Sequence, residues 1–168
     1  MKTILNIIFL GLTVFTTAQN PNLSPFVGDW EWQNGNETFK VNIYIDDNDL
    51  KGNYQLVEIN NGVETIIYDS NKLLNATLNF YYGYAIFGGS HDGVLFFASI
   101  SDNVLLGQGP NDYKNTKDGY LGFTITNNGT NGQPITASWQ IKETTGLKSQ
   151  ETPPTFTIPT DITLTKVN

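Results

Sequence analysis

Asn-Gly and Asp-Gly pairs recur along the chain and divide it into short segments. These pairs are Asn34-Gly35, Asn61-Gly62, Asp92-Gly93, Asp118-Gly119, Asn128-Gly129 and Asn131-Gly132. Such pairs tolerate the positive φ angles that tight hairpin turns require. A chain punctuated at these intervals favours strands joined by hairpins and leaves little room for long helices.

The segments between the pairs alternate between apolar and polar side chains. Phe39, Val41 and Ile43 share one face of their segment, and Lys40 and Asn42 lie on the other. A period of two predicts a strand with one buried face. The segments expected to form strands are residues 26–33, 37–46, 51–60, 63–69, 78–88, 93–101, 103–108, 119–127, 135–142 and 160–167. About ten antiparallel strands in one domain predict an all-β barrel or sandwich.

The first eighteen residues have the pattern of a secretory leader. Lys2 supplies a positive start, residues 4–14 are mostly apolar, and Ala18 follows two small threonines. The apolar run is too short to span a bilayer comfortably. We expect residues 1–18 to be a signal peptide that is removed. The remaining 19–168 would form a single domain, exported to the periplasm or the extracellular space.

Charge and composition exclude several classes of partner and chemistry. The formal net charge is −7, arginine is absent, and cysteine is absent. Nucleic-acid binding needs clustered cations, so it is not expected. Without cysteine the chain has no disulfide, no thiolate metal site and no cysteine nucleophile. No further apolar run is long enough for a membrane helix, so no integral membrane segment is expected after the leader is removed.

The opening of the first strand resembles that of a known superfamily. Gly28-Asp29-Trp30 is similar to the Gly-x-Trp step of lipocalins and fatty-acid-binding proteins, the calycins. The resemblance implies an antiparallel meander that closes into a lipocalin-like β-barrel of about 8–10 strands. It also implies structural roles for Gly28, for Trp30 as a plug at one barrel end, and for Lys166 as a cation over the Trp30 ring.

A second resemblance covers most of the chain. The leader, the opening from Phe26 to Trp32, the acidic hairpin and the strand-rich body together look like an uncharacterised family of small exported proteins from Bacteroidetes-type bacteria. That resemblance implies export and a β-rich fold, and it implies no particular activity.

The lipocalin-like fold leads us to expect a non-enzymatic protein that binds a small apolar or amphipathic ligand, with no cofactor. Ligand pockets are mostly apolar with a few orienting polar groups, which tyrosine combines in one side chain. The residues expected to line the barrel interior are Trp32, Tyr44, Tyr54, Tyr82 and Phe97. Periodicity alone does not tell which face of each strand is inside.

The aromatic-rich stretch from Phe80 to Phe87 supports an alternative function. Consecutive aromatic residues must face both sides of a strand, so some of them are expected outside the core. Exposed aromatic rings would suit a module that docks a protein or a glycan. Core filling is the competing explanation for the same residues.

Other polar clusters are better explained without catalysis or metal binding. His91 lies beside an Asp-Gly turn, and adjacent residues on an extended chain point apart, so no catalytic triad is formed locally. Asp46–Asp49 lacks the further ligands of a calcium loop and is expected to be a solvated hairpin turn. Asp29, Glu31 and Glu37 could form an acid–base pair, but solvated charge on an outer face is the simpler interpretation.

We predict that export removes residues 1–18, because the positive, apolar and small-residue regions occur in the order that signal peptidases recognise. N-terminal sequencing of the exported protein should begin at Gln19. A product that still begins at Met1, or that stays in the membrane through residues 4–14, would contradict the export prediction.

Overall fold

The computed structural model describes residues 22–75, 80–81, 83–105, 116–144 and 155–167. The expected signal peptide lies outside these residues. Within them the chain is almost entirely strand. The strands are β1 Gly28–Asn34, β2 Glu37–Asp46, β3 Asp49–Asn60, β4 Val63–Asp69, β5 Leu73–Asn75, β6 Phe80–Tyr81, β7 Ile86–Ser90, β8 Leu95–Asp102, β9 Lys117–Asn128, β10 Ile135–Glu143 and β11 Asp161–Lys166. The 3-10 turn η2, Thr130–Gly132, joins β9 to β10.

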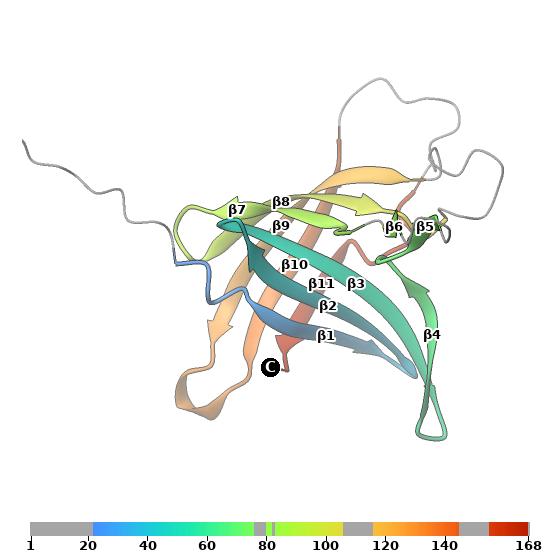
Figure 1. The fold of residues 1–168 in the computed structure, drawn as a ribbon. Helices are drawn as coiled ribbons and strands as arrows, with labels where there is room; N and C mark the ends of the chain where they lie inside the picture. Colours follow the sequence, from blue (N-terminus) through green and yellow to red (C-terminus); the bar gives the residue numbers. More distant parts are fainter. Residues whose placement is uncertain (1–21, 76–79, 82, 106–115, 145–154, 168) are drawn as a thin grey trace, which may run out of the picture.

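Eight of the strands close into an antiparallel barrel (Figure 1). The pairing order is β1-β2-β3-β7-β8-β9-β10-β11, and β11 pairs with β1 to complete the circle. Trp30 faces Lys166 across that closing pair. The prediction of an all-β, lipocalin-like barrel built as an antiparallel meander is therefore confirmed.

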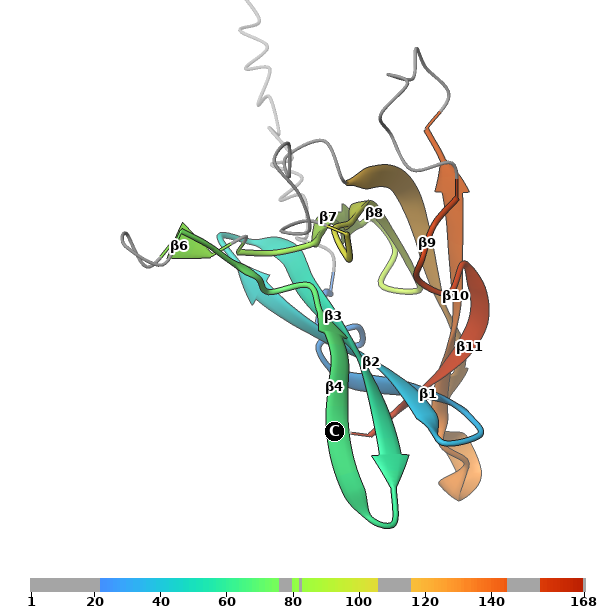
Figure 2. The same ribbon diagram turned by 90° about the vertical axis from the view of Figure 1, so that its right-hand side faces the viewer.

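Strand β3 forks between two partners. Its first part, Leu50–Gly52, pairs with β7, and its second part, Gln55–Asn60, pairs with β4. The β3–β4 hairpin therefore leaves the barrel wall and projects beyond it, as Figures 1 and 2 both show. The register shift between Leu56 and Val57 is a bulge, which increases the local twist where the hairpin departs.

Most of the predicted turns form as hairpins. Asn61 and Gly62 have φ angles of 52° and 79° and connect β3 to β4 as a two-residue turn. The acidic segment Asp46–Asp49 turns at Asp47 and Asn48, whose φ angles are also positive. Both pairs of angles suit the right-handed twist of the flanking strands.

Three sequence predictions about local structure are wrong. Asp118-Gly119 is not a turn but part of β9, where a Cβ on Gly119 would lie 2.7 Å from Phe156 Cζ. Residues 78–88 do not form one strand, because β7 begins only at Ile86. Residues 103–105 of the expected strand 103–108 lie beyond the end of β8, and residues 106–108 are outside the described part of the chain.

Aromatic side chains fill the barrel interior. Eight rings form one connected set of contacts, with the centroids of touching rings 4.9–6.4 Å apart. We call this set the aromatic column: Phe26, Phe96, Phe123, Trp30, Trp139, Phe39, Tyr54 and Tyr68. An eight-stranded barrel is just wide enough for side chains to fill, so the column makes this one a packed core.

Two tryptophans of the column attach irregular segments to opposite ends of the barrel. Trp30 Nε1 donates a hydrogen bond of 2.9 Å to the Phe26 carbonyl oxygen, at the end where β1 begins. Trp139 Nε1 donates one of 2.8 Å to the Pro159 carbonyl oxygen, where β11 begins. Because β1 and β11 are antiparallel, these points lie at opposite ends. Each indole therefore buries its ring while its polar N–H remains satisfied.

We predict that Trp30→Ala lowers the free energy of unfolding by about 3–5 kcal/mol, as large-to-small substitutions of buried aromatic residues do. Trp30 is fully buried, and its ring meets Phe123 edge-on at 4.9 Å. Chemical denaturation measures the effect, with the exposed Val94→Ala as the matched control. An unchanged denaturation midpoint for Trp30→Ala would show that the barrel does not depend on this ring.

Candidate functional site

The residues expected to line a ligand pocket do not come together in one interior. Tyr54 is buried within the aromatic column, and Trp32 packs partly buried against the core. Tyr44 and Phe97 lie on the outer face, since their neighbours Ile43 and Phe96 point inward. Phe97 is 65% exposed. Tyr82 lies outside the described residues.

Tyr54 is part of a buried hydrogen-bond network. Its hydroxyl accepts a hydrogen bond of 3.1 Å from the Asn103 backbone N–H and lies 3.0 Å from the Ser101 carbonyl oxygen. The Asn103 side-chain amide donates to the Ser70 carbonyl oxygen at 2.7 Å. The network joins β3, the end of β4 and the end of β8 at the point where β3 forks. Its geometry gives Tyr54 a structural role.

A second buried polar cluster holds the segment that crosses the end of the barrel before β11. The Asp102 carboxylate accepts hydrogen bonds from the backbone N–H and the hydroxyl of Thr157, at 2.5 and 2.8 Å. Lys117 is buried and forms an ion pair of 2.5 Å with Glu143. Among the described residues no buried side-chain N or O atom lacks a hydrogen-bond partner. Each of these charged side chains therefore has a local partner that compensates its burial.

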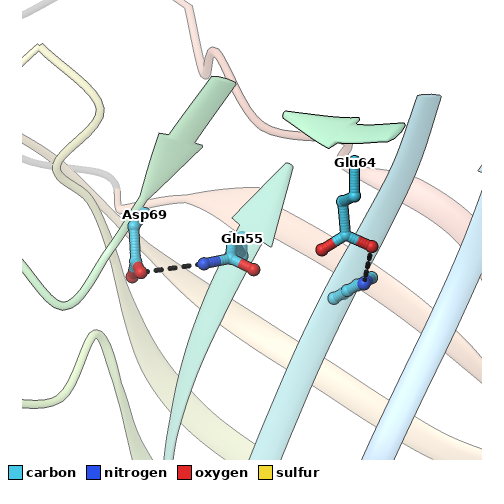
Figure 3. Close-up of polar contacts among 4 residues, drawn as sticks. Gln55, Glu64 and Asp69 are labelled. Carbon is cyan, nitrogen blue, oxygen red and sulfur yellow. Dashed lines mark hydrogen bonds and ion pairs between the residues drawn. The ribbon is translucent and has the colours of Figure 1, made fainter. Parts of the chain in front are cut away.

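A polar groove of about 490 Å³ runs over the outer face of β1, β2 and β3. Four of its polar side chains are paired with one another. Asn42 donates to Asp29 at 2.7 Å, and Gln55 donates to Asp69 at 2.9 Å. Figure 3 shows the Gln55–Asp69 contact and, beside it, the carboxylate of Glu64.

Only two of the three carboxylates considered for acid–base chemistry lie in the polar groove. Asp29 and Glu31 both line the polar groove as alternate residues of β1. Glu37 is not among the residues that line it. Asp29 accepts a hydrogen bond from Asn42, so its carboxylate already has a partner within the groove. The geometry gives no specific support to a paired-carboxylate mechanism.

A second cleft, of about 360 Å³, lies over the outer face of β7, β8 and β9. Tyr84 and Phe87 line one side, and Tyr120 lines the other. Ser99 separates them, because the register places Ser99 opposite both Phe87 and Tyr120. We call this cleft the aromatic groove. Its rings are half-exposed or exposed, with Tyr120 at 60%.

Electrostatic contacts extend the aromatic groove toward β2. Tyr84 and Phe87 lie 5.7 Å apart between ring centroids, and Lys51 Nζ lies 5.0 Å from the Tyr84 ring. A hydrogen bond to Asp46 raises the pKa of Lys51, so the amine stays charged beside the ring. Burial raises the pKa of the adjacent Tyr44 hydroxyl, against the lowering effect of Lys51.

Sequence reasoning finds only part of the aromatic groove. Phe87 belongs to the aromatic-rich stretch, but nothing in the sequence singles out Tyr120. Tyr120 alternates with Leu121, and its outward direction follows only once the structure shows that Leu121 is buried. Its proximity to Phe87 depends on the pairing of three strands, and a linear sequence does not record that pairing.

The remaining candidates are isolated in the structure. His91 is exposed at the bend between β7 and β8, where Asp92 accepts hydrogen bonds from the N–H groups of Val94 and Leu95. Those hydrogen bonds lower the pKa of Asp92. Across the described ranges, no group of three or more His, Cys, Asp or Glu side chains is placed to hold a metal ion.

Lys166 and Trp30 make the contact expected from the Gly-x-Trp opening. Lys166 Nζ lies 5.4 Å from the Trp30 ring centroid and donates a hydrogen bond to the Pro25 carbonyl oxygen at 3.2 Å. Partial burial lowers the pKa of this amine. Gly28 opens β1 with a φ angle of 128°, a conformation that L side chains rarely adopt.

Comparisons with known proteins identify no relative: no protein-family model, no curated protein and no solved structure matches this chain. In the part of the chain that the structure describes, no helix is long and apolar enough to cross a membrane.

We predict that Tyr54→Phe lowers the free energy of unfolding by about 1–3 kcal/mol, because it leaves the buried Asn103 N–H without its acceptor. Tyr84→Phe is the matched control, since Tyr84 is partly exposed on the barrel surface. Urea denaturation of both variants measures the difference. Equal stability of the two variants would contradict the structural role assigned to the Tyr54 hydroxyl.

Proposed function

We propose that this protein is an exported, non-enzymatic binding module that holds an uncharged polysaccharide in the aromatic groove. The observation that carries the proposal is the row Phe87, Ser99 and Tyr120 across three adjacent strands. Neighbouring strands are about 4.8 Å apart, so the two rings stand about 10 Å apart with a small residue between them. That spacing leaves room for about a disaccharide.

The chemistry of the aromatic groove suits sugars. Aromatic rings present flat apolar faces, against which the C–H faces of pyranose rings can pack. Ser99, Ser101 and Asp118 lie among the rings and could bond sugar hydroxyls. The core of a protein–protein interface is depleted in charged residues. Asp118 and Lys51 border these rings, so the aromatic groove suits a sugar better than a protein partner.

The net charge supports a neutral ligand. The chain carries a formal charge of −7 and no arginine, so its overall field repels polyanions. Phosphate or carboxylate recognition would usually use the guanidinium group that this chain lacks. The filled barrel interior supports binding at the surface over binding of a small apolar ligand inside.

We predict that the purified exported form is retarded in affinity electrophoresis by at least one of four neutral polysaccharides: mannan, xylan, mixed-linkage β-glucan or starch. Phe87→Ala and Tyr120→Ala should each weaken the interaction about tenfold, because each removes a stacking surface. Val94→Ala, exposed but outside the aromatic groove, should bind like the native protein.

Thermal unfolding of each variant must match that of the native protein, so that weaker binding is not confused with unfolding. Absence of retardation by all four polysaccharides would contradict the proposal. Retardation that survives the double substitution of Phe87 and Tyr120 would show that binding occurs elsewhere on the surface.

A further inference from the structure

Strand β4 has one unpaired edge in the described structure. The nine-stranded sheet ends at β4, which pairs only with β3 among the described residues. Figures 1 and 2 show no other strand alongside this part of the hairpin, where it projects beyond the barrel. An exposed edge strand presents N–H and C=O groups that can pair with another strand.

The side chains of β4 do not protect this edge. Val63, Ile66 and Ile67 are at least half exposed, and Ile59 adds a further exposed apolar side chain from β3. β4 contains neither lysine nor proline, the residues by which edge strands commonly prevent pairing. Its Glu64 is held by Lys40 in an ion pair of 2.6 Å, which compensates the carboxylate charge.

The hydrogen bonds of β3 reveal which backbone groups of β4 face the free edge. The Ile59 N–H donates to the Asn36 carbonyl oxygen at 2.7 Å, so it points away from β4. Ile59 and Glu64 therefore form a non-hydrogen-bonded pair of the ladder. Since paired and unpaired positions alternate in an antiparallel ladder, Glu64 and Ile66 direct their N–H and C=O groups to the free edge.

These positions are self-complementary. If two β4 strands run antiparallel about a two-fold axis at Thr65, Glu64 of one copy pairs with Ile66 of the other. The same register places the two Thr65 residues opposite each other, before the bulge at Ile67, and Thr–Thr is among the cross-strand pairs that stabilise a sheet. A two-fold contact uses the same patch on both subunits, as this one does.

We propose that the chain forms a homodimer in which two β4 edges pair antiparallel about a two-fold axis at Thr65. Pairing joins the two projecting hairpins into a four-stranded sheet and gives the free backbone N–H and C=O groups of Glu64 and Ile66 hydrogen-bond partners. The proposal is independent of the polysaccharide site, because the aromatic groove lies over β7, β8 and β9.

The absence of cysteine from the native chain allows a direct test by cross-linking. In the proposed register the two Thr65 residues form a non-hydrogen-bonded pair, with Cα atoms about 4.5 Å apart. That separation is within the range of a disulfide bond. Thr65→Cys should therefore form a covalent dimer under mild oxidation at least about tenfold faster than the exposed control Val94→Cys.

Analytical ultracentrifugation of the native chain and of Ile66→Lys provides the second measurement. The native chain should sediment as a dimer at high concentration, and Ile66→Lys should remain a monomer with an unchanged melting temperature. A native chain that is monomeric up to about 1 mM would overturn the proposal. The proposal would also be overturned if Thr65→Cys cross-linked no faster than Val94→Cys. If Ile66→Lys does not fold, the cross-linking measurement alone tests the proposal.

Discussion

The packing of the aromatic column is the interaction on which the rest of the structure depends. Its rings come from strands on all sides of the barrel and touch edge-on or at a tilt, which aromatic pairs prefer. Trp30 and Trp139 connect the column to the segments at the two ends. A chain with no disulfide thus closes its barrel from within, through buried apolar area and satisfied indole N–H groups.

Because side chains occupy the interior, the proposed binding site lies on the outer face of the barrel. The strands contribute inward and outward residues alternately, so each buried ring has an outward neighbour. Over β1 to β3 those neighbours are polar and bond one another. Over β7 to β9 they include Phe87, Phe97 and Tyr120, which no described contact buries fully. The two halves of the barrel therefore offer surfaces of different chemistry.

The fork in β3 makes the described part of the barrel asymmetric. Tyr54 and its hydrogen-bond network lie at the point where β3 exchanges β7 for β4. The network anchors the base of the projecting hairpin, while the exposed isoleucines lie nearer its tip. A buried polar network thus lies between the core and the hairpin that carries the proposed dimer surface.

The sequence by itself determined the strand-rich fold, the hairpins at Asn61-Gly62 and at Asp47–Asn48, and which residues share the apolar face of β2, since these depend on local turn angles and a period of two. It misjudged Gly119, whose glycine serves close packing against Phe156 rather than a turn. It also grouped Tyr54 with Phe97, because alternation tells which residues share a face but not which face is inside. Only tertiary structure decided that. It also decided the placement of Phe87 and Tyr120 on either side of Ser99 and the free edge of β4, because strand pairing joins residues far apart in the chain.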